Sequence, residues 1–355
     1  MKRRILTNEE EEPLSPMARV FQSPGIDYCA VTIMGFKTKI SPDVVLDALK
    51  HNVYKHPRFS SKLSDNGAKW IDTEVNVEDH VTVPYIEPKE IREDGQSFVD
   101  DYNSRLTVIP LDRSRPLWDI HILNVKTTDA EAVGVIRSHH SLGDGMSLCS
   151  LLLECTHKTS DPGTSSTAVP PVKRRGEVLH SLRKKGWFLR SILTIGSTMT
   201  LIWNTTVDML LLFATILFLK DTKTPLKAGA NTRNYPKIFF HRIVSLDDIK
   251  HIKNAMNMVA AELFDRPVRN TTTCVSNVIG PMEEISFRGH PIAYIAPSSY
   301  GHSHALLVHF ISYAEKMIIS MAVDPTVIPD PHKICDEMEK SMKEMKTVLW
   351  ERGLL

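Results

Sequence analysis

The sequence predicts a mixed fold, α/β or α+β, in which short strands alternate with helices along 355 residues. Residues 28–34 (YCAVTIM) are rich in β-branched and aromatic side chains, which is typical of a strand. Ser41 followed by Pro42 is a helix start signal, and apolar residues then recur through residue 50. A chain of this length can bury a large core, so we expect two lobes.

The first predicted lobe covers residues 1–157. After the strand at 28–34 and the helix at 41–50, further short strands are predicted at 118–125 and 132–138. A polar loop follows the last strand, and residues 146–155 are apolar enough for a buried helix.

The middle segment, residues 158–234, differs in composition. Residues 158–173 are rich in Ser, Thr and Pro and predict a mobile linker, and a basic block follows at 173–190. Residues 191–219 are long and apolar enough to cross a bilayer, but Asn204 and Asp208 would be costly at its centre. We therefore expect an in-plane or re-entrant helix pair, broken near 204–208 and held on anionic lipid by the basic block. A helix pair buried between the lobes is the alternative.

The second predicted lobe covers residues 235–355. It begins with a strand that leads into a helix capped by Ser245. Strands are predicted at 274–279, 305–313 and 316–323, and an amphipathic helix at 331–349.

Charge and cysteine content exclude some classes of function. Lys and Arg number 43 against 42 Asp and Glu, so there is no basic field of the kind that nucleic acids require. The five cysteines are scattered and odd in number, which favours a reducing compartment over a disulfide framework. The acidic run 9–12 follows the first residues without an apolar stretch, so no signal peptide is expected.

One motif carries a specific chemical prediction: His139 and His140, followed by Asp144 and Gly145, between a strand and a helix. A histidine titrates near neutral pH and can take a proton from an alcohol, and we assign this role to His140. We expect Asp144 to orient the loop and Gly145 to permit its turn. His139 points away from His140 if the strand continues, so we expect it to be packed and supporting.

Other chemistries have weaker support in the sequence. There is no G-x-S-x-G, no Walker A motif and no dinucleotide glycine pattern. No H-E-x-x-H occurs, and we interpret His302, His304 and His309 as structural. We therefore expect neither a metal ion nor a bound cofactor.

The segment from His139 to Gly145 resembles the HHxxxDG motif of the wax ester synthase/diacylglycerol acyltransferase family of plants and bacteria. Residues 115–118 (RPLW) resemble the PLW motif of that family. Segments 56–59 (HPRF), 276–281 (SNVIGP) and 294–298 (YIAPS) are similar to plant members.

This resemblance implies a two-lobed fold like that of CoA-dependent acyltransferases, with a tunnel between the lobes. It implies that His140 deprotonates a fatty alcohol or diacylglycerol that attacks a long-chain acyl-CoA, here a co-substrate. Pro116, Trp118 and Asn277 are then expected to line the tunnel. It further implies a membrane-associated enzyme at the endoplasmic reticulum and the plasma membrane, with the active site facing the cytosol. Homo-oligomerisation stays open.

The sequence departs from the family after Asn257 and Met258. There the family continues with an Asn-Asp motif and a long stretch of the second lobe, whereas this chain passes directly to residues 259–281. We therefore expect a truncated second lobe. A catalytically impaired, membrane-bound relative that binds acyl-CoA or a partner is the alternative function. The related plant acyltransferases of soluble alcohols and amines are disfavoured, because no DFGWG sequence occurs.

Overall fold

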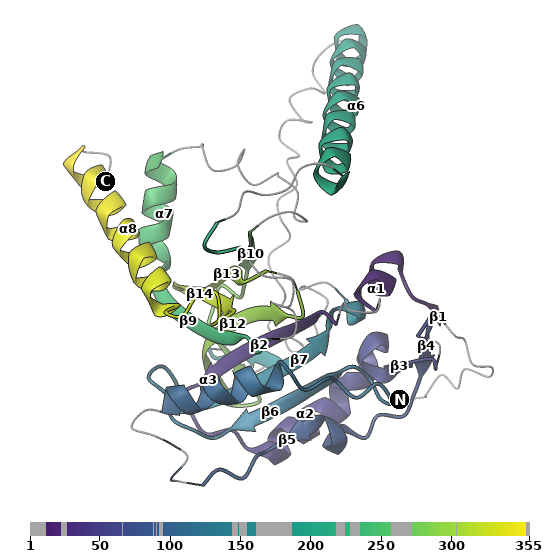
Figure 1. Cartoon of the computed structure of the whole chain (residues 1–355), viewed down its shortest axis with the longest axis vertical. Helices are drawn as coiled ribbons and strands as arrows, with labels where there is room; N and C mark the ends of the chain where they lie inside the picture. The colour runs from purple at the N-terminus through teal and green to yellow at the C-terminus, as the bar shows by residue number, and fades with distance from the viewer. Residues whose placement is uncertain are drawn as a thin grey trace.

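The computed structural model contains two large β-sheets packed together, a small third sheet, and helices on their outer faces (Figure 1). It describes residues 12–22, 27–65, 67–87, 89, 91, 95–143, 148, 155–160, 187–217, 224–227, 235–256, 272–302 and 304–352. The mixed α/β class predicted from the sequence is confirmed.

The first large sheet has seven strands in the order β5-β6-β7-β2-β12-β11-β8. Its antiparallel centre is formed by β2 (Cys29–Phe36), β6 (Trp118–Leu123), β7 (Ala132–His139) and β12 (His290–Tyr300). The short strands are β5 (Val81–Thr82), β8 (Thr156–Lys158) and β11 (Ile285–Phe287). Helices α2 (Pro42–Asn52) and α3 (Gly95–Leu106) belong to the same half of the chain. The predicted strands in this half are confirmed.

Strand β12 joins the two halves of the chain. It comes from the C-terminal segment, yet it pairs with β2 from Tyr300 opposite Cys29 to Ile292 opposite Phe36. Strand β11 of the same segment pairs with β8. The spatial division therefore departs from the predicted one, because residues 285–300 complete the first sheet although they follow residue 235.

The second large sheet has the order β10-β13-β14-β9. Its strands are β9 (Ile238–Ser245), β10 (Thr273–Ile279), β13 (Leu306–Tyr313) and β14 (Lys316–Val323), and the helices α7 (Leu246–Met256) and α8 (His332–Glu351) pack on it. Alternate residues of β13 face opposite ways: Leu307 and Ile311 join the core shared with the first sheet, whereas Leu306 and Val308 face α8.

Short strands, short helical turns and one short helix complete the first half of the chain. Strands β1 (Glu12–Pro13), β3 (Ser61–Leu63) and β4 (Lys69–Asp72) form the third sheet, and short turns of 3₁₀-helix occur at η1 (Val53–Lys55), η2 (Pro57–Ser60), η3 (Val77–His80) and η5 (His140–Leu142). Helix α1 (Pro16–Phe21) starts at Ser15, whose Oγ accepts the N–H of Ala18 at 3.2 Å.

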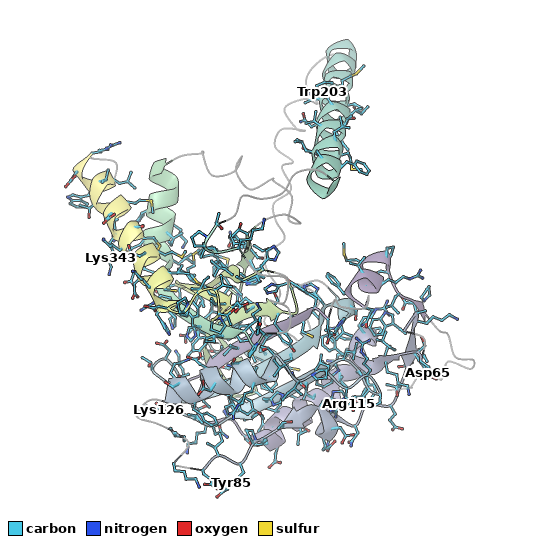
Figure 2. The ribbon with its side chains drawn as sticks, viewed as in Figure 1. Asp65, Tyr85, Arg115, Lys126, Trp203 and Lys343 are labelled. Carbon is cyan, nitrogen blue, oxygen red and sulfur yellow. The ribbon has the colours of Figure 1, made fainter. Side chains whose placement is uncertain are left out.

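Helix α6 (Trp187–Leu217) runs unbroken through 204–208, so the predicted break there is wrong. Asn204 and Asp208 are four residues apart and lie on one side of the helix, where they do not interrupt its backbone hydrogen bonds. The helix stands apart from both sheets, with Trp203 pointing into open space (Figure 2). Its exposed large apolar side chains exclude the buried alternative: Met199, Leu201, Ile202, Trp203, Met209, Leu210, Leu211 and Phe213.

Within the part of the chain that the structure describes, no helix combines the length and apolar character needed to span a bilayer. The predicted helix at 146–155, the linker at 158–173 and the basic block at 173–190 lie mostly outside the described residues.

Candidate active site

The end of β7 presents His140. The strand pairs with β6 on one side and β2 on the other, and it ends at His139. The 3₁₀ turn η5 begins at His140, whose backbone N–H donates to the carbonyl of Tyr28 at 2.8 Å. His140 is therefore fixed through its backbone at the point where the chain leaves the sheet.

The imidazole of His140 lies against two aromatic rings. Its centroid is 4.8 Å from that of Phe21, at the end of α1, and 5.0 Å from that of Tyr28. The Tyr28 ring also lies 5.8 Å from His302, and its hydroxyl is 3.0 Å from the Ser299 hydroxyl on β12. These contacts give His140 a half-buried, partly apolar setting that restricts its ring and excludes part of the surrounding water.

His139 lies in a polar network and is 1% exposed. Its Nδ1 accepts the backbone N–H of Ser141 at 3.1 Å, so the proton of the neutral ring is on Nε2. Nε2 lies 3.2 Å from the Asp27 carboxylate. The hydrogen bond from His139 lowers the pKa of Asp27, which stays ionised at neutral pH. This position suits a supporting role.

Gln22 and Arg113 close the network around His139. Gln22 Nε2 donates to the Ser141 hydroxyl at 2.9 Å and lies 3.1 Å from His139 Nδ1. Arg113 donates to Gln22 Oε1 at 2.7 Å and lies 3.6 Å from Asp27. Because Gln22 directly follows Phe21, the network holds the Phe21 ring beside His140.

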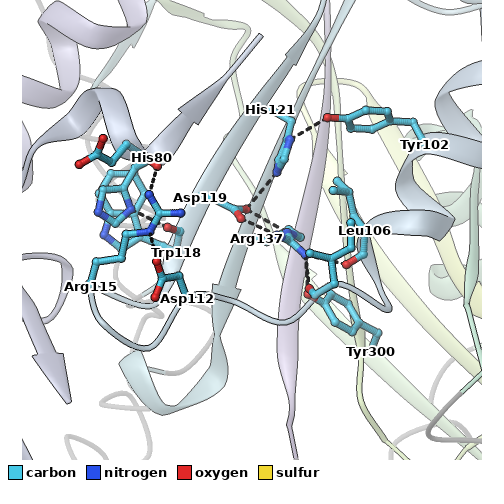
Figure 3. A network of polar contacts seen from close by, with 12 residues as sticks. His80, Tyr102, Leu106, Asp112, Arg115, Trp118, Asp119, His121, Arg137 and Tyr300 are labelled. Carbon is cyan, nitrogen blue, oxygen red and sulfur yellow. Dashed lines mark hydrogen bonds and ion pairs between the residues drawn. The ribbon is translucent and has the colours of Figure 1, made fainter. Parts of the chain in front are cut away.

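Arg137 anchors β7 two residues before this pair (Figure 3). It donates to both oxygens of Asp119 on β6, at 2.9 and 2.5 Å, and to the carbonyls of Leu106 and Ile109 at 2.6 and 2.8 Å. The Arg137 side chain is 3% exposed and that of Asp119 is 14% exposed. Such a bidentate pair fixes both distance and angle between neighbouring strands.

The ionic state of this pair follows from its partners. Burial opposes the Arg137 charge, but the bonds to Asp119 raise the pKa of the guanidinium above its ordinary value. Burial likewise acts against ionisation of Asp119, yet hydrogen bonds from His121 and Arg137 lower its pKa. His121 in turn lies 2.8 Å from the Tyr102 hydroxyl on α3 (Figure 3). The network therefore ties α3, β6 and β7 together behind the site.

The second sheet contributes His309 on the opposite side. His309 has the same parity on β13 as Leu307 and Ile311, so its side chain faces the first sheet. Burial, and to a smaller extent the charge of protonated His140, lower the pKa of His309 to about 4. The two histidines are thus within electrostatic reach. Burial also lowers the pKa of His302 to about 3. Both rings are neutral at neutral pH.

Asn277, predicted to line the tunnel, is on the other face of the second sheet. It pairs with Phe310, whereas its neighbour Ser276 pairs with His309. Phe310 lines an apolar groove of about 550 Å³ between that face and α8. The structure therefore does not bring Asn277 to His140, because neighbouring residues of a strand point to opposite faces. Ser276 has the parity that faces the site.

Pro116 and Trp118, the other predicted tunnel residues, are buried inside the first lobe. The Trp118 ring stacks on His80 at 4.1 Å, and its indole N–H donates to the Phe59 carbonyl at 3.0 Å. The intervening Leu117 carbonyl accepts the N–H of His139 at 2.9 Å. This segment supports the histidine pair through the backbone.

Asp144 and Gly145 lie outside the described residues. Among the residues that are described, no three or more His, Cys, Asp or Glu side chains are arranged to hold a metal ion. Sequence reasoning missed Phe21, Tyr28 and His309 as neighbours of His140. For His309 a signal existed: it is a polar residue on the core-facing side of its strand, between the apolar Leu307 and Ile311.

Two family profiles match the chain. The wax ester synthase/diacylglycerol acyltransferase catalytic domain matches residues 40–261, and the WS/DGAT C-terminal domain matches residues 220–346. Wax ester synthase/diacylglycerol acyltransferase 7 of Arabidopsis thaliana is 58% identical over 480 residues, covering 99% of this chain and 100% of the relative. Number 8 of the same plant is 55% identical over 482 residues, covering 99% of each.

Solved structures share the fold. The wax ester synthase/diacylglycerol acyltransferase from Marinobacter aquaeolei VT8 has a TM-score of 0.61 at 14% identity, covering 94% of this chain and 99% of that one. A starter condensation domain of rhizomide synthetase RzmA, in complex with C8-CoA and Leu-SNAC, has a TM-score of 0.52 at 12% identity, covering 95% and 94%. On the strength of the two profiles and the plant relatives, the chain belongs to the wax ester synthase/diacylglycerol acyltransferase family.

Proposed function

We propose that this chain transfers the acyl group of a long-chain acyl-CoA to the hydroxyl of a fatty alcohol or a diacylglycerol, with His140 as general base. The observation that carries the proposal is the placement of His140, held by its backbone at the end of β7 and enclosed by Phe21 and Tyr28. Membership of an acyltransferase family supports the same reaction.

The proposed mechanism needs one proton acceptor. His140 takes the proton of the substrate hydroxyl as its oxygen attacks the thioester carbon, and the carbonyl electron pair moves to the oxygen. The tetrahedral intermediate then collapses, the carbon–sulfur bond breaks, and the departing CoA sulfur takes the proton back from His140. Acyl-CoA acts as a co-substrate, and the proposal includes no further cofactor.

The supporting residues have defined tasks in this proposal. Arg137 and Asp119 fix β7 against β6, and the network of Gln22, Asp27 and His139 holds the turn that carries His140. The rings of Phe21 and Tyr28 limit the rotation of the imidazole. A base held in one orientation needs little rearrangement to reach the substrate hydroxyl.

We include attachment to the membrane in the proposal, at the endoplasmic reticulum and plasma membrane with the active site facing the cytosol. Support comes from the spacing on α6: Met199, Ile202, Trp203, Met209, Leu210 and Phe213 share one face. Asn204 and Asp208 face the other way. A helix with one apolar and one more polar side can lie in the membrane interface with its apolar face immersed.

Truncation of the second lobe also belongs to the proposal. The alignments with the two plant relatives extend over 480 and 482 residues, more than the 355 of this chain, so those relatives carry residues that it lacks. We place the gap after Met258. This observation favours a second candidate function, in which the chain binds acyl-CoA or a partner without efficient turnover.

The test is acyl transfer by the purified chain in lipid vesicles. Labelled hexadecanoyl-CoA is supplied with either hexadecan-1-ol or dioleoylglycerol, and wax ester and triacylglycerol are separated and counted. Formation of either ester above the protein-free blank supports the enzyme. Saturable binding of hexadecanoyl-CoA without ester formation would favour the binding function instead.

A further inference from the structure

His309 faces His140 from the second sheet. Its neighbours of the same parity on β13 are Leu307, Ile311 and Tyr313, all part of the core that the two sheets share. Because alternate residues of a strand point to opposite faces, the imidazole of His309 points toward the first sheet. Its electrostatic interaction with His140 agrees with this orientation. One histidine comes from each sheet.

The Nδ1 atom of His309 lacks a hydrogen-bond partner. It is buried, and no polar atom of the described residues bonds to it. Buried polar atoms in proteins are nearly always paired, since an unpaired one costs free energy. An unpaired nitrogen that faces the base across the junction of the two sheets has the position expected of a group that binds substrate.

We infer that His309 is a catalytic residue that donates a hydrogen bond from Nδ1 to the oxygen of the thioester as negative charge develops on it. The inference rests on the acyl transfer proposed above. As the alcohol oxygen bonds to carbon, the carbonyl electron pair moves onto this oxygen, and it returns when the carbon–sulfur bond breaks. His309 keeps its proton throughout and forms no covalent bond.

The protonation state of His309 suits this role. Because burial and the charge of His140 lower its pKa to about 4, His309 is a neutral imidazole at neutral pH. It therefore does not compete with His140 for the substrate proton. A neutral ring still carries one N–H, and a fixed donor aimed at a developing oxyanion is a strong contribution to catalysis.

Two substitutions separate hydrogen bonding from packing. His309→Leu keeps bulk but has no donor, whereas His309→Asn places an amide near the former Nδ1. We expect His309→Leu to lower kcat at least about a hundredfold, the usual loss for one oxyanion donor, with little change in KM for hexadecanoyl-CoA. His309→Asn should recover at least about tenfold of that loss. His332→Leu, an exposed histidine on α8, is the control and should match wild type.

A binding measurement tests the inference even if turnover is absent. The probe is a trifluoromethyl-ketone analogue of hexadecanoyl-CoA, whose hydrate mimics the tetrahedral intermediate, with hexadecanoyl-CoA itself as reference. His309→Leu should weaken binding of the analogue at least about tenfold more than binding of the reference. Equal weakening of both, or unchanged affinity for both, would overturn the role of His309. If the wild type forms no ester but His309→Leu still weakens binding of the analogue more than binding of hexadecanoyl-CoA, only the proposed turnover is rejected.

Discussion

Replacing Arg137 by methionine tests how the site is held in place. The guanidinium makes two bonds to Asp119 and further bonds to the Leu106 and Ile109 carbonyls, and it is 3% exposed. Methionine fills similar volume but leaves the Asp119 charge buried without its cation. Breaking a buried pair in this way costs about 3–5 kcal/mol of folding free energy.

The assay is urea unfolding of the purified chain followed by tryptophan fluorescence. Arg58→Met is the matched control: Arg58 also forms a bidentate pair, with Glu12, but the two side chains are 31% and 60% exposed. An exposed pair contributes about 0–1 kcal/mol. If Arg137→Met lowers the free energy of unfolding by no more than Arg58→Met does, burial of the Arg137 pair is not what stabilises β7.

The difference in stability between wild type and Arg137→Met should also depend on pH, in a direction that the pKa of Asp119 fixes. Hydrogen bonds from His121 and Arg137 outweigh burial and lower the pKa of Asp119 in the folded state. Ionised Asp119 therefore stabilises the fold at pH values above its unfolded pKa of about 4, and this stabilisation is lost as the pH falls through the folded value. The difference between wild type and Arg137→Met should thus shrink in acid. A difference that grew on acidification would contradict the assignment.

Two further predictions concern Asp100 on α3 and the apolar face of α6. Burial raises the pKa of Asp100 to about 6, so the ionised carboxylate destabilises the folded state. Asp100→Asn should therefore raise the melting temperature at pH 8 but not at pH 4. An equal rise at both pH values would show that ionisation of Asp100 is not the cause. Trp203→Glu on the apolar face of α6 should weaken binding to anionic vesicles about tenfold or more, because the exposed Trp203 ring would no longer be buried in lipid. Asn204→Glu on the other face should change vesicle binding little. Equal losses in a co-sedimentation assay would refute the predicted orientation.

Several strands of both sheets, among them the one that ends beside His140, could be predicted from their local sequences. Residues 132–136 (AVGVI) and 317–323 (MIISMAV) are mostly apolar, and the structure contains β7 and β14 there. The strand β12 was not predicted as such. Its run includes Pro297, and it is stabilised by β2, which lies far away in the sequence. Pairing of this kind is set by the assembled sheet rather than by local preference.

Local sequence likewise could not predict which side chains from other elements lie beside His140. The motif identified His140, but it could not show which rings enclose it, because Phe21 and Tyr28 belong to other elements. Asn277 was selected for its resemblance to a motif, whereas its face depends on the register of β10 against β13. A shift of one residue exchanges Asn277 for Ser276, and composition alone does not fix that register.

The break predicted in the apolar segment illustrates a different error. Two polar residues in a long apolar stretch suggested that the helix ends near 204–208. In α6 they lie on one side of a continuous helix and leave an apolar face opposite. The spacing of four residues was the signal, since it places both side chains on one face.

The most direct test compares His140→Gln with His139→Gln in the vesicle acyl-transfer assay. The two residues are adjacent, but His140 lies between the aromatic rings, whereas His139 is enclosed by Asp27, Ser141 and Gln22. If His140 is the general base, its substitution lowers kcat at least about a hundredfold. His139→Gln then lowers kcat less than about tenfold once matched for folded protein. Equal losses in the two variants, or a larger loss at His139, would contradict the account.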